Sequence, residues 1–403
     1  HIEGIIHISH KGIGSVRIKG TDDVIEVDHT FLHTACHGDT VRILLHPKRK
    51  DGIQTGEVAE ILRRSKKGFA GILEREHDTY FLIPSDLKMY SDIVIPESKL
   101  NGAKVGQKVF VVITEWKDAK KAPIGEVNNI LGMPMEHNAE MEAIALEKGF
   151  DALFPPSVEK EAEKIAKEGI TESDIRGRRD MRTTTTFTID PEDAKDFDDA
   201  LSFKKLSNGH FEVGIHIADV SHYVKIGTAL DEEARRRGTS VYLVDRTIPM
   251  LPEELSNGLC SLNPNVDRLT FGAVFEIDTN GKVHNEWFGR TVIHSDKRFT
   301  YENAQKVLDD GHGEFYNELS TLNNIAKKLL KKRFDEGAIS LEQEEVKFKL
   351  DDNGVPLSVY TKERGDTNKL IEEFMLLANR RVAEHMAPNI VSTMHQTKNA
   401  CRI

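Results

Sequence analysis

The first 145 residues consist of short segments in which apolar and polar residues alternate, separated by turns rich in Gly, Asp and His. Such alternation is typical of half-buried β-strands. Residues 1–68 contain five of these segments (GIIHIS, GSVRI, VIEV, TVRILL and TGEVAEIL), and residues 69–145 contain five more. Because VGQKVFVVI in the second run parallels HGDTVRILL in the first, we predict two OB-type barrels in tandem, at 1–68 and 69–145. The alternative is one larger β domain.

The pattern changes after residue 145. Residues 158–169 combine helical spacing with strong helix formers, and residues 183–224 alternate as strands do. The segments TFGAVFEID and EWFGRTVIHS flank Asn280-Gly281, a strong signal for a β-hairpin. Further helices are predicted at about 300–310, 314–336 and 367–386. Residues 146–403 therefore predict an α+β domain, and the chain as a whole is predicted to be a multidomain protein.

One segment interrupts the strands with carboxylates. Between Thr188 and Ala200 the chain reads TIDPEDAKDFDDA, and Asp196 and Asp198 share a side if this backbone is extended. Crowded carboxylates raise one another's pKa unless a cation neutralises them. Mg²⁺ is suited to this role because it binds one or two carboxylates together with substrate phosphates. The alternative is a solvated acidic turn. A calcium loop fits poorly, since the D-x-D-x-D-G pattern is absent.

The acidic segment and several others together resemble a known family. The motif TIDPxDAKDFDDA resembles the catalytic signature of the ribonuclease II/ribonuclease R (RNB) family of 3′→5′ exoribonucleases. The resemblance continues through IHIADVSHYV (215–224), EARRRGTSVYL (233–243) and KLIEEFMLLANRRVAEH (369–385). The pattern GTSVYL…IPMLPE…SNGLCSLNP is closer to the ribonuclease R branch of that family.

The resemblance implies a fold and a reaction. It implies two cold-shock-like OB barrels followed by an RNB-type catalytic domain. The implied reaction is processive hydrolysis of RNA to nucleoside 5′-monophosphates with one or two Mg²⁺ ions. The implied metal ligands, which are also the catalytic residues, are Asp190, Asp196, Asp198 and Asp199, with Asp198 the first choice.

The resemblance also implies contacts to RNA. Tyr242 matches a tyrosine that stacks on the 3′-terminal bases, and Tyr301 resembles a position near the terminal ribose. A sugar-contacting glutamate is expected in 369–385; we choose Glu372, with Glu373 as the alternative. Phe69 in the second barrel is a stacking candidate that can equally belong to the core. His216 and Asp219 in HIADV are left out of the metal site, because a His flanked by isoleucines is usually structural.

The net charge, the cysteines and the hydrophobic segments bear on the binding partners and on the cellular compartment. The net charge is −11, of which residues 1–150 carry −2 and the remainder −9, so charge neither supports nor excludes RNA binding. Three distant cysteines, Cys36, Cys260 and Cys401, argue against a disulfide framework or a zinc site. No signal peptide or membrane span is recognisable. We expect a cytoplasmic monomer that acts on single-stranded RNA 3′ ends without a nucleotide cofactor.

Two competing functions stay open. Residues 387–400 do not match the family, and its arginine-bearing segment and C-terminal OB domain have no counterpart here. Because the chain also begins with His1, we expect a fragment truncated at both ends. It can therefore be an RNA-binding but catalytically impaired fragment. A Mg²⁺-dependent phosphotransferase is the third reading, although no GxxxxGK[ST] loop supports it.

Overall fold

The computed structural model describes residues 1–18, 23–339, 346–351, 356–361 and 364–400, with backbone only from residue 388. The chain divides into two compact units, His1–Leu153 and Phe154–Ile403. Cys36 and Cys260 are buried free thiols, and Cys401 lies outside the described residues. None of the helices in the described residues has the length and apolar character needed to cross a membrane.

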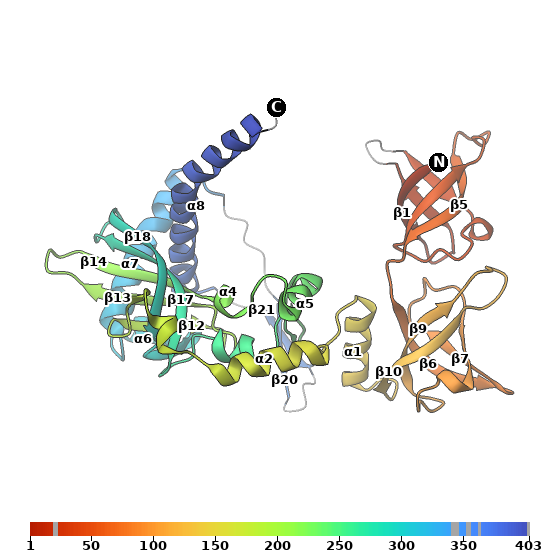
Figure 1. Cartoon of the computed structure of the whole chain (residues 1–403), viewed down its shortest axis with the longest axis horizontal. Coiled ribbons are helices and arrows are strands. Elements are labelled where there is room, and N and C mark those ends of the chain that lie inside the picture. Colours follow the sequence, from red (N-terminus) through yellow and green to blue (C-terminus); the bar gives the residue numbers. More distant parts are fainter. Residues whose placement is uncertain (19–22, 340–345, 352–355, 362–363, 401–403) are drawn as a thin grey trace. The chain divides into compact units, whose positions relative to one another are not determined.

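The first unit begins with a closed five-stranded barrel (Figure 1). Its strand order is β1-β2-β3-β5-β4, with β3 parallel to β5 and the remaining pairs antiparallel. Alternate residues point inward, so Ile6, Val16 and Ile43 are fully buried. The elements are β1 (Ile2–Ile8), β2 (Gly14–Arg17), β3 (Val24–Val27), η1 (His29–Phe31), β4 (Thr40–Leu45) and β5 (Gln54–Arg63).

A second closed barrel follows with the same connectivity. Its order is β6-β7-β8-β10-β9, and β8 is parallel to β10. The repeated topology confirms the prediction of two tandem OB-type barrels and excludes one larger β domain. The elements are β6 (Gly68–Glu76), β7 (Thr79–Pro84), β8 (Ile93–Ile95), η2 (Glu97–Lys99), β9 (Lys108–Glu115) and β10 (Ile124–Gly132).

The boundary between the units lies later than the predicted residue 145. Helix α1 (His137–Glu147) packs its alanines against Ala70 and Phe110 of the second barrel. Because this helix buries its apolar side on the barrel, the first unit continues to Leu153.

The second unit is built on a seven-stranded sheet (Figure 1). Its order is β11-β18-β17-β14-β13-β12-β19; the two edge strands run parallel to their neighbours and the inner pairs are antiparallel. The hairpin predicted at Asn280-Gly281 is confirmed as β17–β18. The strands are β11 (Arg179–Asp180), β12 (Thr185–Asp190), β13 (Asp199–Lys205), β14 (Phe211–Ala218), β17 (Asp267–Ile277), β18 (Val283–His294) and β19 (Lys297–Thr300).

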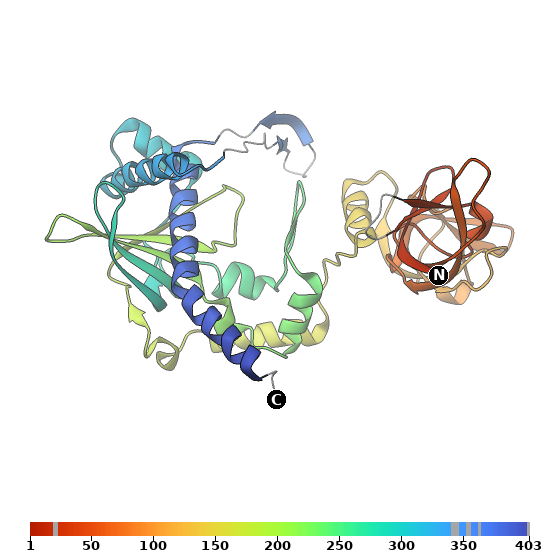
Figure 2. The ribbon, with the colours of Figure 1, turned by 90° about the horizontal axis from the view of Figure 1, so that it is seen from above.

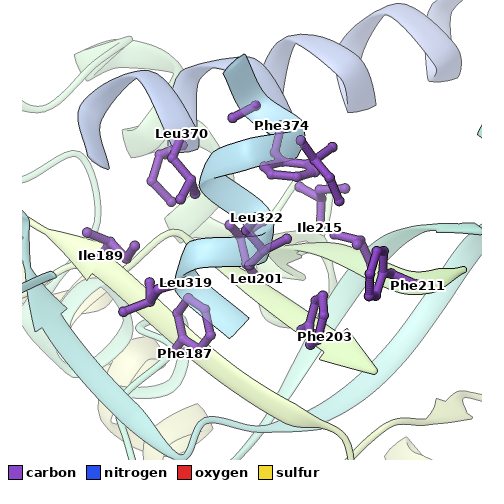
Figure 3. Close-up of a cluster of buried hydrophobic side chains, with 14 of the residues drawn as sticks. Phe187, Ile189, Leu201, Phe203, Phe211, Ile215, Leu319, Leu322, Leu370 and Phe374 are labelled. Carbon is purple, nitrogen blue, oxygen red and sulfur yellow. The ribbon is translucent and has the colours of Figure 1, made fainter. Parts of the chain in front are cut away.

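Three helices cover one face of this sheet (Figure 2): α6 (Tyr301–Asp310), α7 (Tyr316–Asp335) and α8 (Asp366–Ala400). Figure 3 shows the core between them, where Phe187 and Leu201 of the sheet meet Leu319, Leu322 and Phe374 of the helices. Each of these five side chains is fully buried. The predicted helices are therefore confirmed.

The opposite face of the sheet carries shorter elements. Val158 of α2, Phe197 and Leu262 pack there against Val274 and Val292 of the sheet. The α+β architecture is thus confirmed, while the β20–β21 hairpin was not predicted. The remaining elements are α2 (Pro156–Glu168), α3 (Glu172–Ile175), α4 (Val220–Tyr223), α5 (Ala229–Arg237), β15 (Val241–Tyr242), β16 (Thr247–Ile248), η3 (Glu254–Leu259), β20 (Val346–Leu350) and β21 (Pro356–Thr361).

Candidate active site

Two neighbouring strands deliver the ends of the acidic segment to one edge of the sheet. Strand β12 ends at Asp190, and β13, which pairs with it antiparallel, begins at Asp199. The connecting residues 191–198 contain a turn at 192–193 and are otherwise irregular. Because antiparallel partners bring the end of one strand beside the start of the next, Asp190 and Asp199 lie near each other.

The buried side chain of Phe197 determines which side of the connecting segment points into the protein and which side points to solvent. Its ring is buried in the core on the far side of the sheet from α7. Asp196 and Asp198, on either side of it, remain accessible, and the charge of Asp196 acts on Asp198. This arrangement agrees with the prediction that the two carboxylates share a side.

The carboxylates perturb one another. Burial raises the pKa of Asp190 to about 7, and the charges of Asp199 and Asp198 add to the effect. Burial and the charge of Asp198 raise the pKa of Asp199 to about 6. The pKa of Asp198 is raised because the surrounding protein removes part of its solvent, although the residue itself stays accessible, and the charge of Asp196 adds to the effect. The four aspartates therefore form one electrostatic group.

Asp190 supplies the clearest sign that a cation belongs here. Its Oδ2 atom is buried and has no hydrogen-bond partner, which is costly for a carboxylate oxygen unless a cation or a proton compensates. Oxygen donors of this kind suit a hard divalent ion such as Mg²⁺. The donor set of Asp190, Asp196, Asp198 and Asp199 thus fits the expected metal.

The site is open rather than a closed cage. Across the part of the chain that the structure describes, no three His, Cys, Asp or Glu side chains are gathered as a ready-made metal-binding cluster. Mg²⁺ commonly keeps several waters and takes substrate phosphates as ligands, so it needs few protein carboxylates. The four aspartates share one neighbourhood but do not by themselves complete a ligand shell.

Tyr242 is directly joined to the acidic segment. It lies on the small β15–β16 hairpin, and its hydroxyl donates a hydrogen bond to Asp196 Oδ2 at 2.8 Å. Burial of the hydroxyl and the bond to Asp196 raise its pKa to about 12. The residue is nevertheless 65% exposed. An exposed ring does not support the alternative of a packed strand tyrosine.

Tyr301 also lies at the site. It is the first residue of α6, directly after Thr300, which pairs with Asp190 and caps the helix by accepting from Asn303 N–H. Burial raises the pKa of Tyr301 to about 12, and the charges of Asp199 and Asp190 contribute. Strand pairing therefore places this tyrosine beside the two strand-borne aspartates.

The two glutamates of α8 have different environments. Glu373 is 3% exposed and forms an ion pair with Arg333 of α7, at 2.5 Å. Glu372 is exposed and lies 3.5 Å from the same guanidinium. Since Glu373 is committed to holding two helices together, the structure favours Glu372 as the residue available to a substrate.

The prediction that Phe69 stacks on a base is not supported. Phe69 is only 4% exposed and packs in the core of the second barrel with Leu73 and Val111. The reason is its place on β6, where its side chain points into the barrel. A buried ring has no free face for a base, so the core role fits better.

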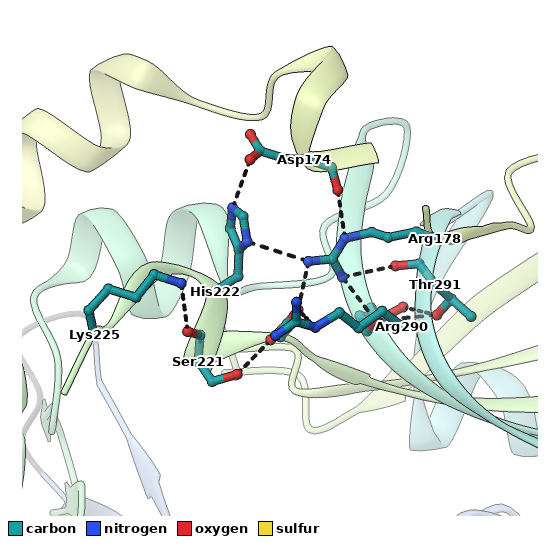
Figure 4. A network of polar contacts seen from close by, with 9 residues as sticks. Asp174, Arg178, Ser221, His222, Lys225, Arg290 and Thr291 are labelled. Carbon is teal, nitrogen blue, oxygen red and sulfur yellow. Dashed lines mark hydrogen bonds and ion pairs between the residues drawn. The ribbon is translucent and has the colours of Figure 1, made fainter. Parts of the chain in front are cut away.

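His216 and Asp219 are structural, as expected. His216 is fully buried between Ser202 Oγ (2.9 Å) and Thr291 Oγ1 (3.2 Å), and burial lowers its pKa to about 3. Asp219 is buried and forms an ion pair with Arg178 at 2.7 Å. Figure 4 shows the polar network around Arg178. Both side chains therefore have protein partners.

Two residues that contact the acidic segment escaped the sequence reasoning. Ser261 and Arg298 both bond to backbone atoms of residues 191–197. Neither has a local pattern that signals such a contact, because each lies more than 60 residues away in sequence. Ser261 lies inside the matched pattern SNGLCSLNP, whereas Arg298 lies outside every matched motif.

Comparison with known proteins fits this geometry. A model described as "RNB domain" matches residues 178–401, and one described as "Cold shock domain" matches 81–155. Ribonuclease R of Thermotoga maritima is 39% identical over 381 residues, which cover 92% of this chain and 53% of the relative. DIS3-like exonuclease 2 of Schizosaccharomyces pombe is 43% identical over 301 residues, covering 70% of this chain and 32% of the relative.

Solved structures give the same result. RNase R of Mycoplasma genitalium, in complex with ribose-methylated single-stranded RNA, matches with a TM-score of 0.87 at 26% identity, covering 96% of this chain and 62% of that one. Yeast Ssd1, a pseudonuclease, shares the fold at 20% identity, with a TM-score of 0.67 over 96% of this chain and 55% of that one. The chain spans about half the length of the curated relatives that cover most of it. Since the RNB match extends over more than half of the chain and contains the entire acidic segment, the chain belongs to the RNB domain family.

Proposed function

We propose that the protein hydrolyses single-stranded RNA from its 3′ end and releases nucleoside 5′-monophosphates with the help of Mg²⁺. The observation that carries the proposal is that four aspartates of one short segment influence one another's pKa, and that the exposed Tyr242 is hydrogen-bonded to one of them, Asp196. Relatives named ribonuclease R and an RNase R structure that holds single-stranded RNA support the same substrate.

The reaction needs a nucleophile and a stabilised leaving group. A water oxygen forms a bond to the terminal phosphorus, the bond from phosphorus to the preceding 3′-oxygen breaks, and that oxygen takes a proton. A bound divalent ion supplies positive charge to the phosphoryl oxygens and lowers the pKa of water. Asp190, Asp196, Asp198 and Asp199 would hold it. Asp190 and Asp199 must lose their protons to do so, since metal ligands bind deprotonated.

The tyrosines and Glu372 would position the RNA. The exposed ring of Tyr242 offers a stacking surface for a terminal base, which tolerates any base type. Its hydroxyl bond to Asp196 would fix the ring relative to the acidic segment. Tyr301 is proposed beside the terminal ribose, and Glu372 as an acceptor for a 2′-OH, the group that distinguishes RNA from DNA.

RNA binding without hydrolysis is the competing function. The structural likeness to the pseudonuclease Ssd1 concerns the fold alone. The presence of all four aspartates and the unpaired oxygen of Asp190 favour an enzyme. The proposal requires neither a nucleotide cofactor nor a second copy of the chain, because one chain supplies every group invoked.

A labelled-RNA assay tests the proposal. Single-stranded RNA carrying a 5′ label should shorten progressively from the 3′ end with Mg²⁺ and stay intact in EDTA. The nucleotides released from uniformly labelled RNA should co-migrate with nucleoside 5′-monophosphates. RNA that is bound but stays intact with Mg²⁺ would establish the binding function instead. Internal cuts at the earliest times would contradict exonucleolytic action.

A further inference from the structure

The acidic segment needs outside support to keep its shape. Residues 191–198 form neither helix nor strand, and the mutual repulsion of their carboxylates favours a more open conformation. A turn bond from Ala194 N–H to Pro191 C=O (3.2 Å) contributes locally. Other backbone groups of the segment are paired with residues from distant parts of the second unit.

Ser261 bridges the middle of the segment. Its hydroxyl accepts from Phe197 N–H at 3.0 Å and donates to Lys195 C=O at 2.8 Å. The residue is fully buried, so removing the hydroxyl would leave a backbone donor and a backbone acceptor without this partner. Lys195 and Phe197 flank Asp196, which means that Ser261 spans the residue that carries one of the carboxylates.

The bridge is itself held in place. Leu262 N–H, next along the chain, donates to Phe197 C=O at 2.8 Å. The Arg268 guanidinium donates to the Ser261 carbonyl at 2.7 Å and to that of Gly258 at 3.1 Å. Ser261 is therefore a rigid support for the segment.

Arg298 holds the beginning of the segment. Its guanidinium donates to the carbonyls of Pro191 and Glu192, the latter at 2.9 Å. It also lies 5.4 Å from the Phe197 ring centroid, within the range of a cation–π contact. Arg298 is on β19, which pairs with the strand that ends at Asp190. It thus ties the turn to that strand.

We propose that Ser261 and Arg298 are positioning residues that hold the acidic segment in the shape required for its aspartates to bind one divalent ion together. They act through backbone atoms and need not touch RNA. This inference rests on the proposed function, and it adds residues that set the affinity for the metal. Changes to groups that orient metal ligands typically cost about 10- to 100-fold in metal affinity or activity.

The test measures metal binding without RNA. Binding of Mn²⁺ alone to the protein is followed by the loss of the free-ion electron paramagnetic resonance signal. We expect Ser261→Ala to raise the Mn²⁺ dissociation constant about 10- to 100-fold, with metal-free RNA affinity unchanged. Ser261→Thr keeps the hydroxyl and should restore most of the affinity. Arg298→Lys, which cannot serve both carbonyls and the ring equally well, should weaken Mn²⁺ binding as well.

Ser202→Ala is the matched control. Ser202 is equally buried, but its hydroxyl binds His216 Nε2 at 2.9 Å and not the acidic segment. It should lose comparable stability and keep its Mn²⁺ affinity. The inference is overturned if Ser261→Ala and Arg298→Lys bind Mn²⁺ as the parent does, or if Ser202→Ala loses as much affinity. Should Ser261→Ala fail to fold, Arg298→Lys decides.

The experiments distinguish failure of the positioning role from failure of the proposed function. A parent protein that binds no Mn²⁺ and leaves RNA intact refutes the proposed function. If the parent hydrolyses RNA but Ser261→Ala and Arg298→Lys bind Mn²⁺ as the parent does, only the positioning role is refuted.

Discussion

At the scale of single residues, four aspartates of one short segment occupy four different environments. Asp190 is buried with an unpaired oxygen, Asp196 accepts a bond from Tyr242, and Asp198 is exposed. Asp199 begins a strand and is half-buried. Because the buried members are hard to ionise in the absence of a cation, the site destabilises the metal-free protein at neutral pH.

The first prediction concerns that cost. The pKa of Asp190 is raised from 3.8 to about 7, so its stabilising contribution is fully present below about pH 3.8 and is lost as the pH rises through about 7. In EDTA, Asp190→Asn should therefore melt several degrees above the parent at pH 8. This advantage should shrink on going to pH 5. Scanning calorimetry at both pH values checks it, and an advantage that grew at pH 5 would contradict the assignment.

The second prediction separates the two roles of Tyr242. Tyr242→Ala should change the length of the shortest RNA left after digestion, because the stacking surface for the last nucleotides is lost, a contact worth about 1–3 kcal/mol per base. Tyr242→Phe keeps the ring, loses the bond to Asp196 and should leave that length unchanged. If Tyr242→Phe changes the length of the shortest RNA as Tyr242→Ala does, the hydrogen bond to Asp196 and not base stacking sets that length.

Only some of the site residues could be predicted from the sequence. It found the aspartates because carboxylates crowded within one segment are unusual, and it found Tyr242 and Tyr301 through motif resemblance. It chose Glu372 but had to keep Glu373 as an alternative, because their difference depends on Arg333 of another helix. Ser261 and Arg298 were missed for a similar reason: their bonds to the segment exist only in three dimensions.

At the scale of elements, the strands and helices were predictable because their apolar periodicity is strong. The exceptions have physical causes. The end of the first unit was placed too early, because the alanines by which α1 packs on the second barrel give little apolar signal. Phe69 was considered for stacking because sequence alone does not say which face of β6 is inward.

The third prediction belongs to the contact between α7 and α8. Glu373→Gln should lower the free energy of unfolding by about 1–2 kcal/mol, because a buried carboxylate paired with a partly exposed arginine is lost. Glu372→Gln, one position earlier but exposed, should change it by less than about 0.5 kcal/mol. Urea denaturation of the two variants checks the difference. Equal losses would mean that Glu373 does not join the helices as described.

At the scale of the whole molecule, the chain divides into two compact units. The two barrels lie in the first unit, and the seven-stranded sheet with its helices lies in the second. The chain has two tryptophans, and each unit contains one of them: Trp116 in the first and Trp287 in the second. Trp116→Phe and Trp287→Phe variants therefore make intrinsic fluorescence report on one unit at a time.

The fourth prediction uses these reporters. A ligand that binds the folded state stabilises the unit that holds its site. Mg²⁺ should raise the melting temperature reported by Trp287 and leave that reported by Trp116 unchanged. A shift seen only by Trp116 would place the metal in the barrels and contradict the candidate site.

The central claim is that the acidic segment performs metal-dependent hydrolysis, and one comparison tests it most directly. Asp198→Asn and Asp193→Asn make the same chemical change in the same segment, but only Asp198 belongs to the coupled carboxylates. With Mg²⁺ and 5′-labelled single-stranded RNA, Asp198→Asn should slow 3′→5′ shortening by about 10²-fold or more, with RNA affinity near that of the parent. Asp193→Asn should act as the parent does. Turnover of Asp198→Asn within about tenfold of the parent, or equal losses in both variants, would contradict the account.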